Sequence, residues 1–164
     1  MAEAPSQAEQ LREIFGGTER PGGWAVHPDA TLPAVLGLSL GIDGDGHLTG
    51  TLPVGDHLKQ PMGVVHGGVY ATIAESLASI ATARDVVADG AVALGQSNYT
   101  SFLRPVTEGA IHATATRRHR GRTSQVWQVD MFDDGGHLAA SSSVTIAVRP
   151  RRAPGVEPTA PARG

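Results

Sequence analysis

Residues 60–84 read Gln-Pro-Met-Gly-Val-Val-His-Gly-Gly-Val-Tyr-Ala-Thr-Ile-Ala-Glu-Ser-Leu-Ala-Ser-Ile-Ala-Thr-Ala-Arg. Glycine and polar residues open this stretch, and a long alanine-rich apolar run follows them. Between His66 and Arg84 the only formal charge belongs to Glu75. A solvated helix of this length carries several charged residues on its outer face. The stretch therefore predicts a helix over 66–87 that is buried nearly all round, with one carboxylate inside it.

The spacing of the helix residues divides them into two sides. At about 100° per residue, one stripe collects the large apolar side chains, namely Val69, Ile73, Leu77 and Ile80. The other side collects small residues and the acid, namely Ala71, Glu75, Ala78, Ser79 and Thr82. Because small residues let another backbone approach closely, we expect a second subunit to cover this side. Glu75 would then lie at a subunit interface.

Strand-like runs lie on both sides of the helix. Two precede it, at 36–40 and 47–54, and four follow it, at 92–102, 110–118, 124–132 and 138–148. Consecutive strands joined by short turns predict an antiparallel meander. The expected fold is α+β, with an antiparallel sheet of about five to six strands wrapped around one long central helix.

The ends of the chain differ in character from this middle part. Residues 1–34 predict a short helix at 7–15 and then a loop, and residues 35–150 form the expected domain. Residues 151–164 are mostly Pro, Ala, Arg and Gly, a composition typical of a disordered tail. The opening residues are polar and acidic, unlike a signal peptide, and no apolar run reaches membrane-spanning length. We expect a cytoplasmic protein without a membrane segment.

Several site classes are disfavoured. The net charge of −3 gives no pull toward nucleic acid, and the absence of Cys removes thiolate chemistry. The seven His residues show no His-x-x-x-His spacing, so no metal is expected. If Asp43 began a calcium loop, position twelve would be Val54 rather than Glu, so 41–46 predicts a hairpin turn instead. No phosphate-binding loop and no Gly-x-Ser-x-Gly elbow is present, and no cofactor is expected.

Glu75 is the first candidate for chemistry. A buried carboxylate is costly unless it is hydrogen-bonded, protonated or functional. The alternative is a structural ion pair across the interface, with Arg84 or Arg104 as the partner. Ser79 lies one turn further along the same face, where its hydroxyl could orient a water molecule or the carboxylate.

The residues before the helix are the second candidate. His66, Gly67 and Gly68 lie at the expected helix N-terminus, where free N–H groups and the positive end of the helix dipole point outward. Glycines there let a ligand come close to the backbone, so the arrangement can hold an oxyanion. Gln60 lies just upstream and offers a neutral amide donor. Each of these residues also has an ordinary structural interpretation, as a loop-to-helix joint or a solvated side chain.

Basic residues collect late in the chain. One group surrounds an expected strand end and turn (Arg117, Arg118, Arg120, Arg122), and another follows the last strand (Arg149, Arg151, Arg152). If the sheet brings Arg104 and these groups together, they suit a polyphosphate such as the 3′-phosphoadenosine diphosphate of coenzyme A.

Five stretches resemble a known superfamily. Val65-His-Gly-Gly-Val-Tyr-Ala-Thr-Ile-Ala-Glu75 resembles the His-Gly-Gly…Glu/Asp signature of hotdog-fold acyl-CoA thioesterases. Residues 93–106, Ala-Leu-Gly-Gln-Ser-Asn-Tyr-Thr-Ser-Phe-Leu-Arg-Pro-Val, and residues 142–152 resemble 4-hydroxybenzoyl-CoA thioesterases that use a helix Glu. Residues 59–68 and 125–133 are also similar to 1,4-dihydroxy-2-naphthoyl-CoA hydrolases of the same superfamily. The resemblance covers about residues 35–152.

The resemblance implies a hotdog fold assembled as a dimer of dimers, with each active site at a dimer interface. It implies that Glu75 is the nucleophile or general base, and that the Gly67 N–H polarises the thioester carbonyl. Gln60 and His66 match supporting loop residues. Ser79 matches a Thr that helps to position the attacking water.

The resemblance also implies a coenzyme A site. Arg104, Thr123 and Arg152 match residues that bind the nucleotide, and Arg122 stands where relatives have Ser. Gly68 belongs with the glycines that the substrate approaches. The implied reaction is hydrolysis of an aryl-CoA such as 4-hydroxybenzoyl-CoA to the free acid and coenzyme A.

Other functions remain open at this point. The acyl group could instead be 1,4-dihydroxy-2-naphthoyl, phenylacetyl or a medium-chain group. A hydratase or dehydratase on the same fold is disfavoured, because its His-with-carboxylate pattern is missing. A non-catalytic acyl-CoA binding module is disfavoured by the joint presence of Glu75, Gln60 and the glycines.

Overall fold

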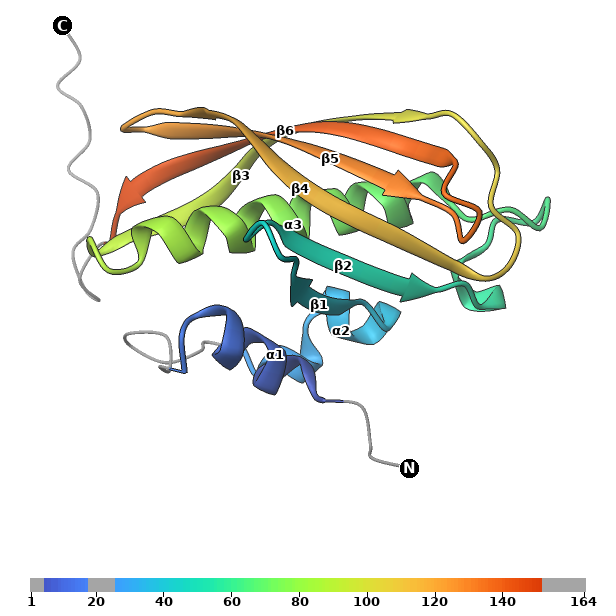
Figure 1. Ribbon diagram of the computed structural model, residues 1–164, viewed down its shortest axis with the longest axis horizontal. Coiled ribbons are helices and arrows are strands. Elements are labelled where there is room, and N and C mark those ends of the chain that lie inside the picture. Colours follow the sequence, from blue (N-terminus) through green and yellow to red (C-terminus); the bar gives the residue numbers. More distant parts are fainter. Residues whose placement is uncertain (1–4, 18–25, 152–164) are drawn as a thin grey trace, which may run out of the picture.

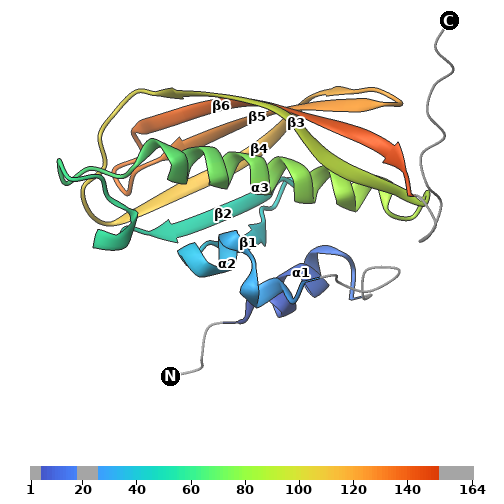
Figure 2. The same ribbon diagram turned by 180° about the vertical axis from the view of Figure 1, so that it is seen from behind.

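One six-stranded antiparallel sheet lies along a single long helix in the computed structural model, which describes residues 5–17 and 26–151 (Figures 1 and 2). The helices are α1 (Gln7–Ile14), α2 (Leu32–Leu36) and α3 (Gly67–Val86). The strands are β1 (Ser39–Ile42), β2 (Leu48–Pro53), β3 (Ala91–Phe102), β4 (Ala110–Arg120), β5 (Ser124–Phe132) and β6 (Leu138–Pro150). Short 3-10 turns cover Pro28–Ala30 and Asp56–Leu58. This confirms the predicted α+β class and the long central helix.

The order of strands in the sheet is β1-β2-β4-β5-β6-β3. β4, β5 and β6 form the predicted meander, but β3 pairs with β6 over almost its whole length and not with β4. The prediction that all four later strands follow one another was therefore wrong. The chain after β3 crosses the end of the sheet, where the N–H groups of Leu103 and Arg104 both donate to Ala139 O. As a result β3 is an edge strand, which Figure 2 shows running along α3.

α3 buries its large apolar side chains against the sheet. Ile73 and Leu77 are almost fully buried, as the phasing predicts. Ala78 and Thr82 are 0% exposed as well, and Thr82 Oγ1 accepts a hydrogen bond of 2.8 Å from Trp127 Nε1. The prediction that these two residues share the outer side with Glu75 was wrong, because both are small enough to fit under the sheet.

The outer side of α3 is narrower than predicted. It consists of Ala71, Glu75 and Ser79, which are half-buried within one chain, with Ile80 beside them. A helix buried nearly all round is thus not what a single chain forms. This half-open stripe is where another surface can meet Glu75.

Of the N-terminal helices, α1 packs on β1, at the sheet edge opposite β3, and α2 packs on α3. Ser6 and Glu9 cap α1 reciprocally, and Leu11 and Ile14 belong to the hydrophobic core. Gln10 Oε1 accepts from Leu40 N at 2.7 Å, which ties α1 to β1. The helix predicted at 7–15 is confirmed.

The segment before β1 differs from its prediction. Residues 32–36 form α2 rather than loop and strand. This helix ends at Gly37, whose positive φ of 85° turns the chain into β1. The predicted strand at 36–40 therefore begins later, at Ser39. Apart from Arg151, the predicted tail lies outside the described residues, and the division of the chain at residues 34 and 150 stays a prediction.

Candidate active site

Glu75 lies on the outer stripe of α3, and its carboxylate is held by its own helix. Glu75 Oε1 accepts a hydrogen bond of 2.8 Å from Ser79 Oγ, one turn further along. Within the described residues Glu75 forms no ion pair, and Arg84 instead reaches Gly46 O at 3.4 Å. One chain therefore does not form the structural ion pair that was the alternative for this carboxylate.

β3 leaves room for that carboxylate at Gly95. A Cβ added to Gly95 would lie 2.8 Å from Glu75 Oε1, and the strand carries a bulge between Gly95 and Ser97. Asn98 Nδ2 donates to Ala71 O at 2.9 Å, so β3 is also tied to α3 one turn earlier. Sequence reasoning assigned no role to Gly95 or Asn98. A glycine inside a strand pattern, which marks a bulge or a close approach, was the available signal for Gly95.

The N-terminus of α3 offers an unused backbone donor. His66 is the N-cap residue, and its Nδ1 accepts from Gly68 N at 2.9 Å. No acceptor within the described residues takes the N–H of Gly67. Because this N–H stands at the positive end of a 20-residue helix, it can stabilise an oxyanion. A Cβ on Gly67 would come 2.8 Å from Phe102 Cζ.

The predicted site residues line three neighbouring pockets. Gln60, Gly67 and Arg104 line one of about 370 Å³. His66 and Gly68 line a second of about 370 Å³. Glu75 and Ser79 line a third of about 510 Å³, on the outer side of α3.

Gly67 and Glu75 of one chain do not meet at one reaction centre. Eight residues of helix separate them by about 12 Å along the axis. The carboxylate also bends toward Ser79, which lies away from the helix N-terminus. A carbonyl group bound to the Gly67 N–H is thus out of reach of Glu75 in the same chain.

The basic residues fall at two ends of the sheet. Arg104 follows the Phe102 end of β3. Thr123 lies at the Ala91 end, where its O accepts from Arg149 Nη1 at 2.9 Å. Eleven residue steps of strand separate these ends by about 36 Å. The expectation that Arg104 joins the basic groups was therefore wrong within one chain.

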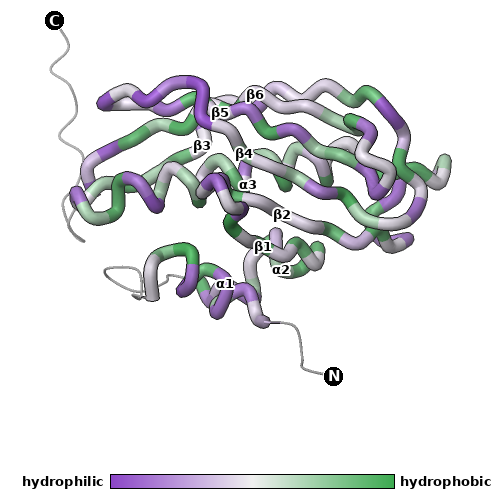
Figure 3. The backbone as a smooth tube through the Cα atoms, in the orientation of Figure 1, coloured by the Kyte–Doolittle hydropathy of each residue, from purple (hydrophilic) through white to green (hydrophobic). Residues whose placement is uncertain are grey.

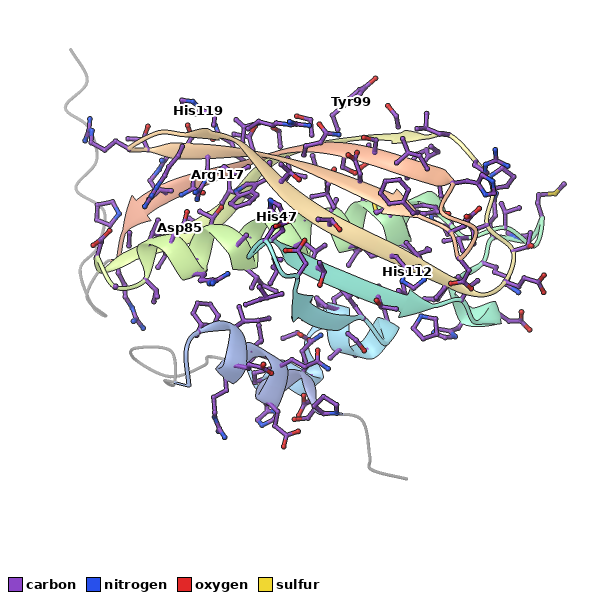
Figure 4. The ribbon with its side chains drawn as sticks, viewed as in Figure 1. His47, Asp85, Tyr99, His112, Arg117 and His119 are labelled. Atoms are coloured by element: carbon purple, nitrogen blue, oxygen red, sulfur yellow. The ribbon has the colours of Figure 1, made fainter. Side chains whose placement is uncertain are left out.

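Not every arginine of the β4–β5 turn is free to bind a ligand. Figure 3 shows strongly hydrophilic colour at this turn. Arg117 pairs with Asp85 and lies 5.4 Å from the centre of the Trp127 ring, so it has a structural role (Figure 4). Arg122 and Thr123 are exposed at the tip. Arg152 lies outside the described residues.

Tyr70 lines the same pocket as Gln60. Burial raises the pKa of its phenol, and Asp133 raises it further, so the group stays neutral at pH 7.

Among the described residues one group brings three possible metal-ligand atoms within 4.8 Å of one another, namely Asp43, Asp45 and His47. In that group Asp43 Oδ1 accepts from the N–H groups of Asp45 and His47, which closes the predicted hairpin turn.

The chain is similar in sequence to known thioesterases. Residues 62–140 match the family model described as the thioesterase superfamily. The 1,4-dihydroxy-2-naphthoyl-CoA hydrolase of Escherichia coli is 35% identical over 105 residues, which span 64% of this chain and 76% of that protein. The proofreading thioesterase EntH of Cronobacter turicensis is 35% identical over 121 residues, or 72% of this chain and 85% of that protein.

The chain is also similar in structure to a solved thioesterase. A mutant of thioesterase PA1618 from Pseudomonas aeruginosa superposes with a TM-score of 0.74 at 28% identity, covering 90% of this chain and 96% of that one. The sheet wrapped along one long helix is thus the hotdog fold that the sequence predicts. Two relatives are 35% identical over 105 and 121 residues, and a solved thioesterase has the same architecture, so the chain belongs to the thioesterase superfamily and is a thioester hydrolase.

Proposed function

We propose that this enzyme hydrolyses an acyl-CoA thioester with an apolar or aryl acyl group, at a site shared by two copies of the chain. The main observation behind this proposal is the environment of the Glu75 carboxylate. It accepts a hydrogen bond from Ser79, packs against Gly95 and is half-buried on the outer side of α3. That a relative 35% identical to this chain is named a CoA-thioester hydrolase supports coenzyme A as the leaving group.

The edge strand supports the shared site. β3 pairs on one side only, and Leu94 and Tyr99 on it are 53% and 75% exposed. An exposed edge of this kind pairs readily with another strand. A second copy pairing antiparallel about a two-fold axis near Asn98 and Tyr99 would bring its Phe102 end beside Gly95. Because Gly67 contacts Phe102, the free N–H of one copy would then lie next to Glu75 of the other.

The same two-fold axis would also complete the coenzyme A site. Arg104 of one copy would lie near Arg122 and Thr123 of the other, which are far apart within one chain. The basic residues would then converge on one nucleotide after all. Pairing of two such dimers would give the proposed dimer of dimers.

In the proposed reaction the thioester carbonyl oxygen accepts a hydrogen bond from Gly67 N–H, with the Gln60 amide as a second donor. Such a donor is worth about 3–4 kcal/mol in the transition state. Glu75 either attacks the carbonyl carbon, forming an anhydride that water then cleaves, or takes a proton from the water that attacks directly. In both routes the C–S bond breaks and the coenzyme A thiolate departs.

Mixing two inactive variants tests the shared site. Glu75→Gln removes the carboxylate. Gly67→Pro removes the single N–H, and proline is well tolerated at this first helical position after the extended His66. We expect each variant alone to lose at least about a hundredfold in kcat. Coexpressed, they form mixed dimers with one intact site each and recover about a quarter of wild-type activity, as random pairing in a two-fold dimer predicts.

Gly67→Ala is the matched control for the proline variant. It makes the same contact with Phe102 but keeps the N–H, so it retains most of the activity. Light scattering of the same samples reports the number of chains in each assembly. If coexpressed Glu75→Gln and Gly67→Pro chains form dimers that stay inactive, the site lies within one chain and the proposal is wrong.

A further inference from the structure

Asn98 joins the edge strand β3 to α3 at the turn of helix that precedes Glu75. Its Nδ2 donates a hydrogen bond of 2.9 Å to Ala71 O. In an α-helix the carbonyl oxygen of residue 71 also accepts the backbone N–H of residue 75. The two bonds do not compete, because a carbonyl oxygen has two lone pairs. The amide of Asn98 is therefore bound to the same oxygen atom that holds the backbone of Glu75.

Two further hydrogen bonds fix the orientation of this amide. Thr100 Oγ1 donates to Asn98 Oδ1 at 2.8 Å, and Thr100 Oγ1 also lies 2.8 Å from Ser142 Oγ. A hydroxyl group carries one proton, and that of Thr100 points to Asn98, so Ser142 is the donor in the second bond. The network thus runs in one direction, from Ser142 through Thr100 and Asn98 to the backbone of α3.

The network begins in the interior of the sheet. Ser142 is 0% exposed, and it lies opposite Thr100 in the register of β6 and β3. β6 has a strand partner on each side, whereas β3 pairs on one side only and runs along α3 (Figure 2). The three hydrogen bonds therefore tie α3 to a well-held strand by way of the sheet edge.

The Glu75 carboxylate depends on the spacing between β3 and α3. Gly95 lies three residues before Asn98, and a Cβ added to it would come 2.8 Å from Glu75 Oε1. The strand carries a bulge between Gly95 and Ser97. Because a bulge interrupts the ladder of backbone hydrogen bonds, pairing with β6 does not by itself fix this part of β3 against the helix. The hydrogen bond from Asn98 to Ala71 O supplies that contact.

Burial in the core does not explain the placement of the Asn98 side chain. Asn98 is exposed in a single chain, and yet both ends of its amide are hydrogen-bonded within the protein. In the proposed dimer the β3 strand of the second copy would lie beside Asn98 and shield these bonds from water. The bond to α3 would then be strongest in the assembly that carries the complete site.

We propose that Asn98 is a positioning residue for the reaction. Its amide sets the position of the Glu75 carboxylate relative to β3, and Thr100 and Ser142 set the direction of the amide. In this role Asn98 acts on turnover through Glu75 rather than by contact with the substrate. The inference rests on the proposed function, because it takes Glu75 as the catalytic carboxylate.

Asn98→Ala is the first test. We expect kcat for a CoA thioester to fall about tenfold to a hundredfold with KM unchanged, since a displacement of about 1 Å is enough for the larger loss. Circular dichroism and light scattering show whether fold and assembly persist. Ser101→Ala is the control, because Ser101 lies on the same strand and its hydroxyl forms no hydrogen bond within the described residues. An Asn98→Ala enzyme with wild-type kcat, or with a loss that appears in KM alone, would overturn the inference.

A matched pair at Thr100 is the second test, and it decides the question if Asn98→Ala does not assemble. Thr100→Val keeps the shape of the side chain but removes the donor to Asn98 Oδ1, whereas Thr100→Ser keeps the hydroxyl. We expect Thr100→Val to lower kcat by about threefold to tenfold and Thr100→Ser to keep it near the wild-type value. Equal kcat values for the two variants would contradict the proposed network.

A double variant shows whether the two residues act together. Residues of one hydrogen-bond network have non-additive effects, so adding Thr100→Val to Asn98→Ala should cause no further loss in kcat. Losses that multiply in the double variant would show that Thr100 does not act through Asn98.

Glu75→Gln separates this inference from the proposed function. Adding Asn98→Ala to Glu75→Gln should leave the residual kcat unchanged, because the carboxylate that Asn98 positions is gone. A further tenfold loss would show that Asn98 acts elsewhere and would overturn the inference. If Glu75→Gln is inactive while Asn98→Ala turns over like the wild type, the proposed function stands and only this inference is wrong. If Glu75→Gln itself turns over like the wild type, the proposed function fails, and the inference fails with it.

Discussion

Glu75 depends on the absence of a side chain at Gly95. The 2.8 Å between an added Cβ and Oε1 means that Gly95→Ala pushes the carboxylate aside. We expect kcat to fall by about a hundredfold with little change in KM, since a displacement of about 1 Å is enough for such a loss. Steady-state release of the coenzyme A thiol gives both constants.

Gly44→Ala is the control for this change. It lies in the β1–β2 turn, where an added Cβ meets nothing within 4 Å, so it should leave both constants unchanged. A Gly95→Ala enzyme with wild-type kcat would show that Glu75 does not need its observed position.

At the scale of elements, two turns share one design. Asp133 and Asp43 each begin a turn that ends four residues later in His137 and His47. Asp133 Oδ1 accepts from His137 N at 2.9 Å, and this bond, assisted by the imidazole, lowers the pKa of the Asp133 carboxyl below its usual 3.8. The ionised form is therefore favoured in the folded state.

This lowered pKa makes a prediction about stability. A carboxyl whose pKa falls on folding contributes stability above its unfolded pKa and loses it as pH falls through the folded value. Asp133→Ala should lower Tm by a few degrees at pH 7, and the difference should shrink as the pH falls below 3.8. Thermal unfolding followed by circular dichroism across this range measures it. A difference that stays constant from pH 7 to pH 2 would contradict the assignment.

Most elements could be predicted from sequence because their patterns are local. β5 has strict alternation of buried and half-buried residues, and turn residues bound it on both sides. The partner of β3 could not be predicted this way, since a strand's own pattern does not say which neighbour it pairs with. The face of α3 was also predicted only in part. Ala78 and Thr82 are as small as the outer residues, so size does not separate the two sides.

At the scale of the whole molecule, the candidate site could be predicted as a set of residues but not as a place. The sequence pattern singles out Glu75, Gly67 and Gln60 as candidate site residues, yet within one chain they line separate pockets. In the proposed dimer their meeting depends on contacts between copies, and no local sequence pattern encodes such contacts. The same holds for Arg104 and Arg122, which lie at opposite ends of the sheet.

The proposed dimer therefore predicts how these arginines act. Arg104→Ala and Arg122→Ala should each raise KM for a CoA thioester by about tenfold, the effect of losing a charged hydrogen bond. The same variants should leave KM for the matching pantetheine thioester unchanged, because that substrate lacks the nucleotide. Arg84→Ala is the control and should change neither value, because Arg84 reaches Gly46 O in the β1–β2 turn. An equal rise for both substrates would remove these arginines from the nucleotide site.

The proposed reaction and the proposed shared site both take Glu75 as the catalytic carboxylate. Glu75→Gln keeps the size of the side chain and an acceptor for Ser79, so the fold and assembly should persist in circular dichroism and light scattering. The direct measurement is the turnover of benzoyl-CoA by this variant, followed as released coenzyme A thiol. We predict a loss in kcat of at least about a hundredfold. Turnover close to that of the wild type would contradict the account.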